Sequence, residues 1–171
     1  MKLEYLECGK ILAPHGVHGA VRLESWCDSP AVAAALPTLY LRSSDGAYTG
    51  RRVLRASLHK GGVLATLEGL STPEEAARLR GATVYAKRED LDPKGEQVFL
   101  AETVGLAVYD AKDGRHLGTV KEVDTSRKTA LYLIATEGGE VMLPAVPEFI
   151  KEIDLARGML VTPISGFFDE I

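Results

Sequence analysis

The sequence predicts an all-β protein made of two small β-barrels that a short linker joins. Apolar and polar residues alternate with a period of two over many short segments, which is typical of half-buried strands. Glycine-rich turns such as Ser44-Asp45-Gly46 and Lys60-Gly61-Gly62 separate these segments. The 171 residues suffice for two domains of roughly 80 to 90 residues each. Barrels are favoured because closure removes unpaired strand edges.

The first half shows the clearest alternation. Val21–Glu24 and Leu54–His59 each place apolar residues on one face and polar residues on the other. Thr38–Arg42, Val63–Glu68 and Thr83–Lys87 are predicted as further strands. We therefore expect these five short strands before residue 90.

Two short helices are predicted within the first half. Thr72-Pro73-Glu74-Glu75 combines a capping box with proline at the first helical position, and Gly81 can end that helix. Ser29 and Pro30 precede an apolar run, 31–36, that Pro37 ends. Neither segment is long enough to form a helical layer.

A polar segment at residues 88–97, rich in Pro, Gly and charge, marks the domain boundary. We expect a first domain at residues 1–90, a linker at 91–97 and a second domain at 98–171. The second half predicts two hairpins, one helical turn and a last strand. These are Val104–Tyr109 with Leu117–Val123, Leu131–Ala135 with Val141–Leu143, the turn at Phe149–Ile153, and Met159–Thr162.

Several classes of protein are excluded. The longest uninterrupted apolar runs fall far below the roughly 20 residues that span a bilayer. Glu4 and Glu7 stand where a secretory signal needs basic and then apolar residues, so we expect a cytoplasmic protein. Cys8 and Cys27 are expected to be free thiols, because they are too few and too far apart for a disulfide framework or a zinc site.

Charge is distributed unevenly along the chain. Residues 1–90 contain 12 Lys and Arg and 10 Asp and Glu, whereas residues 91–171 contain 8 and 14, which gives net charges of +2 and −6. A protein that coats a duplex by phosphate neutralisation is usually strongly basic throughout. The acidic second half instead favours a basic protein partner.

No motif for catalysis is present in the sequence. It lacks a nucleotide-binding glycine loop, a nucleophile with its base and a metal-ligand cluster. We therefore expect no enzymatic activity, no cofactor and no metal. His15 and His18 are more simply explained as surface residues of a turn than as metal ligands.

Two segments of the first half are candidate binding sites. Pro14-His15-Gly16-Val17-His18-Gly19 is either a plain hairpin connection or a shaped binding loop. The second is a group of basic residues, Arg51, Arg52, Arg55, His59 and Lys60. Arg51, Arg55 and His59 share parity on a strand, so they form either a phosphate-facing stripe or a solvated face opposite a packed face of Leu54, Ala56 and Leu58.

A third candidate, Val98-Phe99-Leu100, follows the linker directly. It either begins the core of the second domain or exposes an aromatic anchor for a partner.

Beyond these local patterns, the sequence resembles the ribosome maturation factor RimM family. The opening signature is 8–22, Cys-Gly-Lys-Ile-Leu-Ala-Pro-His-Gly-Val-His-Gly-Ala-Val-Arg. The similarity continues through Leu67–Leu70, Glu75–Gly81, Val104–Val108 and Leu117–Val120, and reaches Leu143–Val146 and 153–161. It therefore spans nearly the whole chain.

The resemblance implies a fold and a function. It implies an N-terminal barrel like domain II of translation elongation factors and a C-terminal PRC barrel. It also implies a non-enzymatic factor, here expected to be a cytoplasmic monomer, that supports 16S rRNA processing and late assembly of the 30S subunit head. The implied partners are small-subunit ribosomal protein nineteen and the immature subunit with its rRNA.

The resemblance also points to site residues. The family usually carries paired tyrosines followed by Asp-Leu after the linker. This chain has Val98-Phe99 and then Glu102-Thr103, so Phe99 and Val98 are the candidates for binding the ribosomal protein. The candidates for rRNA or ribosome contact are Lys10, His15, His18, Arg51, Arg52, Arg55 and Lys60.

Two other functions remain open at this point. A flavin-type barrel enzyme would be yellow when purified or would be stabilised by a small ligand. A PRC-barrel docking module for a non-ribosomal partner would leave residues 98–171 indifferent to ribosomal proteins.

Overall fold

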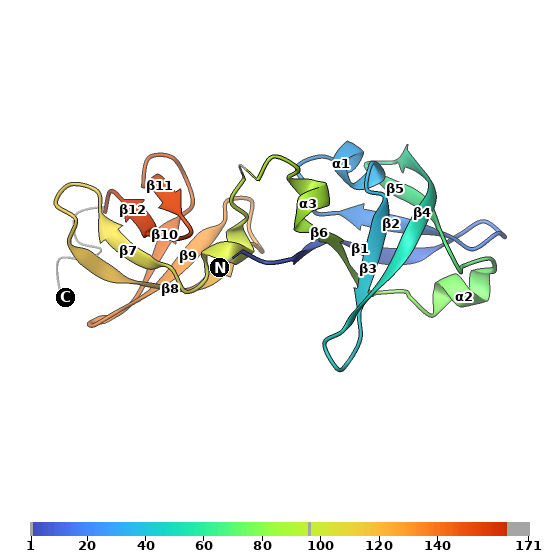
Figure 1. Cartoon of the computed structure of the whole chain (residues 1–171), viewed down its shortest axis with the longest axis horizontal. Coiled ribbons are helices and arrows are strands. Elements are labelled where there is room, and N and C mark those ends of the chain that lie inside the picture. Colours follow the sequence, from blue (N-terminus) through green and yellow to red (C-terminus); the bar gives the residue numbers. More distant parts are fainter. Residues whose placement is uncertain (1, 96, 164–171) are drawn as a thin grey trace. The chain divides into compact units, whose positions relative to one another are not determined.

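The computed structural model describes residues 2–95 and 97–163 and is almost entirely β-structure (Figure 1). The all-β expectation is therefore confirmed. Residues 4–95 form one compact unit, and residues 97–163 form the other together with residues 2 and 3. No helix in these described ranges is both long enough and apolar enough to cross a membrane.

The first unit is a closed six-stranded barrel in the order β1-β2-β5-β4-β3-β6. Its strands are β1 Tyr5–His15, β2 Ala20–Ser25, β3 Thr38–Arg42, β4 Tyr48–His59, β5 Gly62–Leu67 and β6 Thr83–Lys87. Alternation explains its core, because Val63, Ala65 and Leu67 of β5 are buried while the residues between them are partly exposed.

Three short helices accompany this barrel: α1 Pro30–Ala34, α2 Pro73–Ala77 and α3 Arg88–Leu91. At the start of α2 the Thr72 hydroxyl accepts a hydrogen bond from the Glu75 N–H at 3.2 Å, as the capping box predicts. α3 lies in the segment where the sequence shows no apolar period. An ion pair between Arg88 Nη1 and Asp92 Oδ2, at 3.1 Å, links its two ends.

The second unit is a six-stranded sheet in the order β10-β9-β8-β7-β12-β11. Its elements are the 3-10 helix η1 Leu100–Thr103 and the strands β7 Ala107–Asp110, β8 His116–Asp124, β9 Leu131–Thr136, β10 Gly139–Pro144, β11 Ile150–Asp154 and β12 Gly158–Val161. Val108, Val120, Tyr132, Ile134 and Met159 are at most 1% exposed and form the centre of its core.

The helical turn expected at Phe149–Ile153 is wrong. β11 begins at Ile150 and pairs antiparallel with β12, with Ile150 opposite Val161. β12 in turn pairs parallel with β7. The pairing partner of this segment is the predicted last strand, and the ladder that it provides decides the conformation.

Candidate binding surfaces

An exposed apolar surface lies at the start of the second unit. Val98, Leu100 and Val104 are 39%, 38% and 46% exposed, and Phe99 is half-buried among them. We call these four residues the η1 surface. The sequence pointed to Val98, Phe99 and Leu100 but not to Val104, which directly follows the 3-10 helix. The expected aromatic, Phe99, is only partly exposed, and its role as an anchor stays a prediction.

A buried carboxylate fixes the backbone beneath the η1 surface. Glu102 is 1% exposed, and its Oε2 accepts a hydrogen bond from the Phe99 N–H at 3.2 Å. Its Oε1 accepts a hydrogen bond from the Leu3 N–H, also at 3.2 Å. A buried charge needs such partners, and here they hold both the start of η1 and the segment before β1.

Thr103 supports η1 from the other side. Its hydroxyl donates a hydrogen bond to the Leu100 carbonyl at 2.5 Å, and its side chain also forms a hydrogen bond with Tyr132. Burial raises the pKa of Tyr132, and this hydrogen bond opposes the rise. The pair Glu102-Thr103 thus acts as a rigid support for the apolar residues.

Exposed carboxylates surround much of the second unit. Glu122, Glu137, Glu148 and Glu152 are exposed. Glu140 forms an ion pair with Lys121, and the hydrogen bond in this pair is the main cause that raises the Lys121 pKa. The excess of acidic residues that the sequence shows therefore reaches the solvent, where it can act on a partner.

In the first unit, two of the expected basic residues converge on Glu68. Arg51 Nη1 donates a hydrogen bond to the Glu68 carbonyl at 3.0 Å, and Arg52 Nε lies 3.9 Å from its carboxylate. Both members of the Arg52–Glu68 pair are well exposed, so the pair contributes little to stability.

The expected stripe of Arg51, Arg55 and His59 is wrong, because the three residues do not lie on one side of the sheet. The register of β4 against β5 shifts between Val53, which faces Leu67, and Arg55, which faces Thr66. This bulge places one extra residue in β4, so the parity changes there. Facing residues share a side of the sheet, and Arg51 faces the buried Leu39 of β3.

The same bulge overturns the expected packing of Leu54, whereas Ala56 and Leu58 stay on the side of the buried Ala65 and Val63. Leu54 is 54% exposed and Leu58 is 62% exposed, and only Ala56 packs against the core. Val53 packs against the core instead. The outer side of the barrel therefore carries the exposed Leu54 as well as basic residues.

The remaining expected contact residues lie along the β1–β2 and β4–β5 hairpins. Lys10 lies on β1 opposite Glu24, His15 ends β1, and His18 is exposed in the loop. Lys60 has a positive φ of 46° in the β4–β5 turn. The His15 and His59 rings meet edge to face, with their centroids 5.4 Å apart. Within residues 2–95 and 97–163, no three metal-ligating side chains converge.

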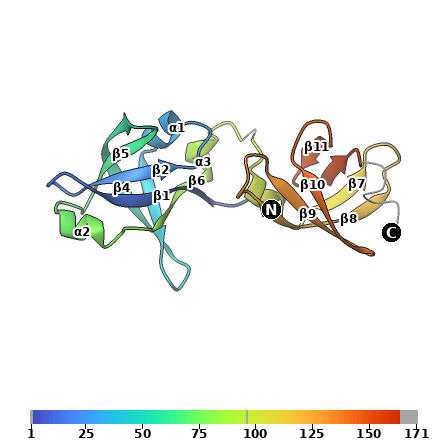
Figure 2. The same cartoon turned by 180° about the vertical axis from the view of Figure 1, so that it is seen from behind.

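The Pro14–Gly19 loop is a shaped structure that requires one of its glycines. Gly19 has a φ of +81°, and a Cβ added there would lie 2.8 Å from the Leu70 carbonyl oxygen. In both Figure 1 and Figure 2 this hairpin tip lies beside the segment that leads into α2. The Gly19 end of the loop is therefore packed against a neighbour, whereas a Cβ at Gly16 would meet nothing within 4 Å.

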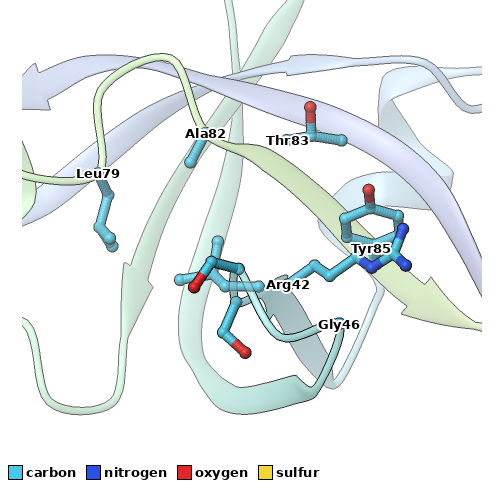
Figure 3. A pocket seen from close by; sticks show the side chains of 9 residues that line it. Arg42, Gly46, Leu79, Ala82, Thr83 and Tyr85 are labelled. Atoms are coloured by element: carbon cyan, nitrogen blue, oxygen red, sulfur yellow. The ribbon is translucent and has the colours of Figure 1, made fainter.

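A pocket that the sequence did not reveal opens beside Arg42. It has a volume of about 520 Å³ and lies between the β3–β4 hairpin and β6, with Leu79 and Ala82 on one wall. Figure 3 shows the Arg42 side chain extending toward Tyr85. A second hollow of about 470 Å³, in the other unit, is lined by Arg115 and His116.

The two cysteines are free thiols, as expected. Burial raises the pKa of the Cys8 thiol to about 12, and Cys27 adds to the rise. Burial also raises the Cys27 pKa, and a hydrogen bond with the Ser25 side chain opposes this rise. Cys8 is therefore a core residue without thiolate character at neutral pH.

Comparisons with known proteins agree with these features. The RimM N-terminal domain family matches residues 6–91, and the RimM PRC barrel domain family matches residues 101–165. A ribosome maturation factor RimM of Symbiobacterium thermophilum is 37% identical over 98% of this chain and 96% of the relative. A ribosome maturation factor RimM of Nitratidesulfovibrio vulgaris is 32% identical over 96% of this chain and 94% of the relative.

One solved structure is also similar. The crystal structure of a 16S ribosomal RNA processing protein RimM from Pseudomonas aeruginosa is 25% identical, with a TM-score of 0.47. The alignment covers 95% of this chain and 99% of that one. On the two family matches and the curated relatives, the chain belongs to the RimM family of ribosome maturation factors.

Proposed function

We propose that this protein is a non-enzymatic assembly factor for the head of the small ribosomal subunit. In this proposal the second unit binds the basic head protein, small-subunit protein nineteen, and the first unit contacts rRNA. Membership of a family of ribosome maturation factors supports the general role in ribosome assembly and 16S rRNA processing. The observation that carries the choice of partner surface is the exposed η1 surface on a strongly acidic half of the chain.

The η1 surface has the anatomy of a binding hot spot. Its aromatic residue, Phe99, is held by a buried hydrogen-bond network, and its aliphatic neighbours are exposed. Energetically dominant interface residues are commonly aromatic and sit among apolar contacts that exclude water. A rigid anchor also loses little side-chain entropy when the partner binds.

The charge of the second half supports a basic partner. Exposed carboxylates such as Glu122 and Glu152 would steer a lysine- and arginine-rich protein toward this unit. Steering of this kind weakens with salt, because exposed charges are screened beyond about 10 Å at 0.1 M ionic strength.

The first unit would meet rRNA at a few phosphates. Arg52, Arg55 and Lys60 are exposed on β4 and its turn, and His15 and His18 are exposed at the β1–β2 hairpin. Lys10 and Arg51 are less exposed and would contribute from the sides of this surface. In this assignment residues 1–90 serve RNA, residues 98–171 serve the protein, and residues 91–97 link the two.

Such a factor needs no reactive centre. By binding one arrangement of the head more tightly than others, it shifts the assembling population toward that arrangement. It leaves when the mature contacts remove the preference. This action fits a monomeric cytoplasmic protein that associates with immature subunits and not with finished ones.

Calorimetric titration of the full chain with purified protein nineteen tests this function. We expect binding that weakens with added salt and that Phe99→Ala weakens by more than about 1 kcal/mol. The matched control is Leu58→Ala, which removes an exposed apolar side chain from the first unit and should leave binding unchanged. Equal affinity of wild type and Phe99→Ala would remove the η1 surface from the proposal, and equal co-sedimentation with mature and immature subunits would refute the assembly role.

A further inference from the structure

The strands β3 and β6 form an incomplete seam in the barrel, and the pocket beside Arg42 lies at this seam. The two strands pair at one position, Tyr40 with Tyr85, whereas β3 and β4 pair along the whole of Thr38–Arg42. Past Tyr40 the strands separate, which opens the space of about 520 Å³. That volume falls within the roughly 300 to 1,000 Å³ of small-ligand sites.

Aromatic rings hold the Arg42 guanidinium at the pocket. Its Cζ lies 5.7 Å from the centroid of the Tyr48 ring, and the side chain forms a hydrogen bond with Tyr85. Tyr48 is itself stacked on Tyr5, with centroids 4.1 Å apart and planes 11° from parallel. The planar cation is therefore presented in a defined orientation before any ligand arrives.

The positive charge of Arg42 remains available to a ligand. Among residues 2–95 and 97–163, no carboxylate forms an ion pair with it. The neighbouring pocket residues Ser44 and Thr83 supply hydroxyl groups, and Leu79 and Ala82 supply an apolar wall. A planar cation, hydroxyl groups and an apolar wall together match the needs of a nucleobase with its sugar and phosphate.

We propose that this pocket binds an unpaired nucleotide of RNA, with the base stacked on the Arg42 guanidinium and the ribose near the hydroxyl groups of Ser44 and Thr83. The proposal rests on the proposed function, since that function brings the first unit to rRNA, and it adds a site apart from the hairpin residues given above. Bases in an RNA duplex are already stacked and paired, so only an unpaired nucleotide can enter.

A basic protein segment fits this site less well than RNA. Arg42 already lies over Tyr48, and Lys87 Nζ lies 5.8 Å from the Tyr40 ring centroid. An incoming lysine or arginine would meet these cations at the same rings and be repelled.

The test is fluorescence anisotropy of the full chain with a short labelled single-stranded RNA of mixed sequence, and with a fully paired hairpin as the second probe. Arg42→Gln and Arg42→Lys should both weaken single-strand binding by roughly 5- to 150-fold, because loss of one stacked base costs about 1 to 3 kcal/mol. Arg42→Lys keeps the positive charge but loses the planar guanidinium, so this variant separates base stacking from simple attraction of the phosphate.

The matched control is Arg115→Gln, which removes one positive charge from the hollow of the second unit. This variant should change the affinity for single-stranded RNA by less than about twofold. Tyr85→Phe keeps the ring, removes the hydroxyl that holds Arg42, and should weaken binding less than Arg42→Gln does. Unchanged urea midpoints for these variants would show that each protein is folded.

Four results would overturn the proposal. The first two are full RNA affinity in Arg42→Lys and equal affinity for the paired hairpin and the single strand. The others are a loss of RNA affinity in Arg115→Gln equal to that in Arg42→Gln, and Arg42 variants that alter binding of a basic ribosomal protein but not of RNA. Titration of the same variants with protein nineteen separates this site from the proposed function. Arg42→Gln should retain that binding, whereas failure of protein nineteen to bind the wild type would count against the proposed function alone.

Discussion

The carboxylate of Glu102 accepts hydrogen bonds from the backbone N–H groups of both Leu3 and Phe99, each at 3.2 Å. One buried side chain therefore ties the segment that precedes the first barrel to the start of η1. The apolar residues of the η1 surface owe their position to this acidic residue.

Glu102→Ala should lower the free energy of unfolding by ~2–4 kcal/mol, because it leaves two N–H groups without their acceptor. Urea denaturation of the full chain measures this. Glu140→Gln, which breaks the exposed pair with Lys121, should cost less than ~1 kcal/mol. Similar losses in the two variants would mean that Glu102 is not a structural anchor.

Gly19→Ala should destabilise the first unit far more than Gly16→Ala. Both glycines have positive φ, +81° and +69°, so each substitution carries a backbone penalty of ~1–2 kcal/mol. Only at position 19 would the new Cβ also meet the Leu70 and Ser71 backbone at 2.8 Å. Thermal unfolding of the two variants checks the difference, and equal melting temperatures would contradict the packed loop.

Leu54→Gln should change stability by less than ~0.5 kcal/mol, because the β4 bulge leaves this side chain 54% exposed. Leu39→Ala, at a site 3% exposed on the adjacent strand, should cost ~2–5 kcal/mol. Chemical denaturation of both variants tests the bulge directly. A large loss of unfolding free energy in Leu54→Gln would mean that β4 has the unbroken alternation that the sequence predicts, without the bulge.

Cys8 should make the protein less stable as the pH rises above 9. Its folded pKa is raised to about 12, above the ordinary thiol value of 9.0, so the unfolded chain releases the thiol proton first. This contribution is fully present below the unfolded pKa and falls by about 1.4 kcal/mol per pH unit until the folded pKa is reached. Urea midpoints between pH 8 and pH 10 should fall more steeply for the wild type than for Cys8→Ala, and parallel curves would contradict the burial of the thiol.

The same burial predicts the order of thiol alkylation. Cys27 is only partly buried, and it should react with iodoacetamide before Cys8. Cys8 should react at the rate of unfolding, which mass spectrometry of timed samples can follow. Simultaneous labelling of both thiols in the folded protein would exclude this order.

Local pattern determined most of the strands. Thr38–Arg42 and Thr83–Lys87 have the predicted bounds, because their side chains alternate between a buried and an exposed face. The α2 start was also visible, because a capping box acts through residues only three apart. The family could be recognised because its signature residues are contiguous in the chain.

The tertiary structure decided the features that depend on a partner strand. Leu54 became exposed because the bulge in β4 is set by its register against β5, and β11 became a strand because β12 lies beside it. Arg42 and Tyr48 face each other across the β3–β4 hairpin, but they meet Tyr85 only because β6 adjoins β3 in the closed barrel. Alternation specifies which residues face the core, but the sequence alone does not specify which strands become neighbours, and the binding surfaces depend on those neighbours.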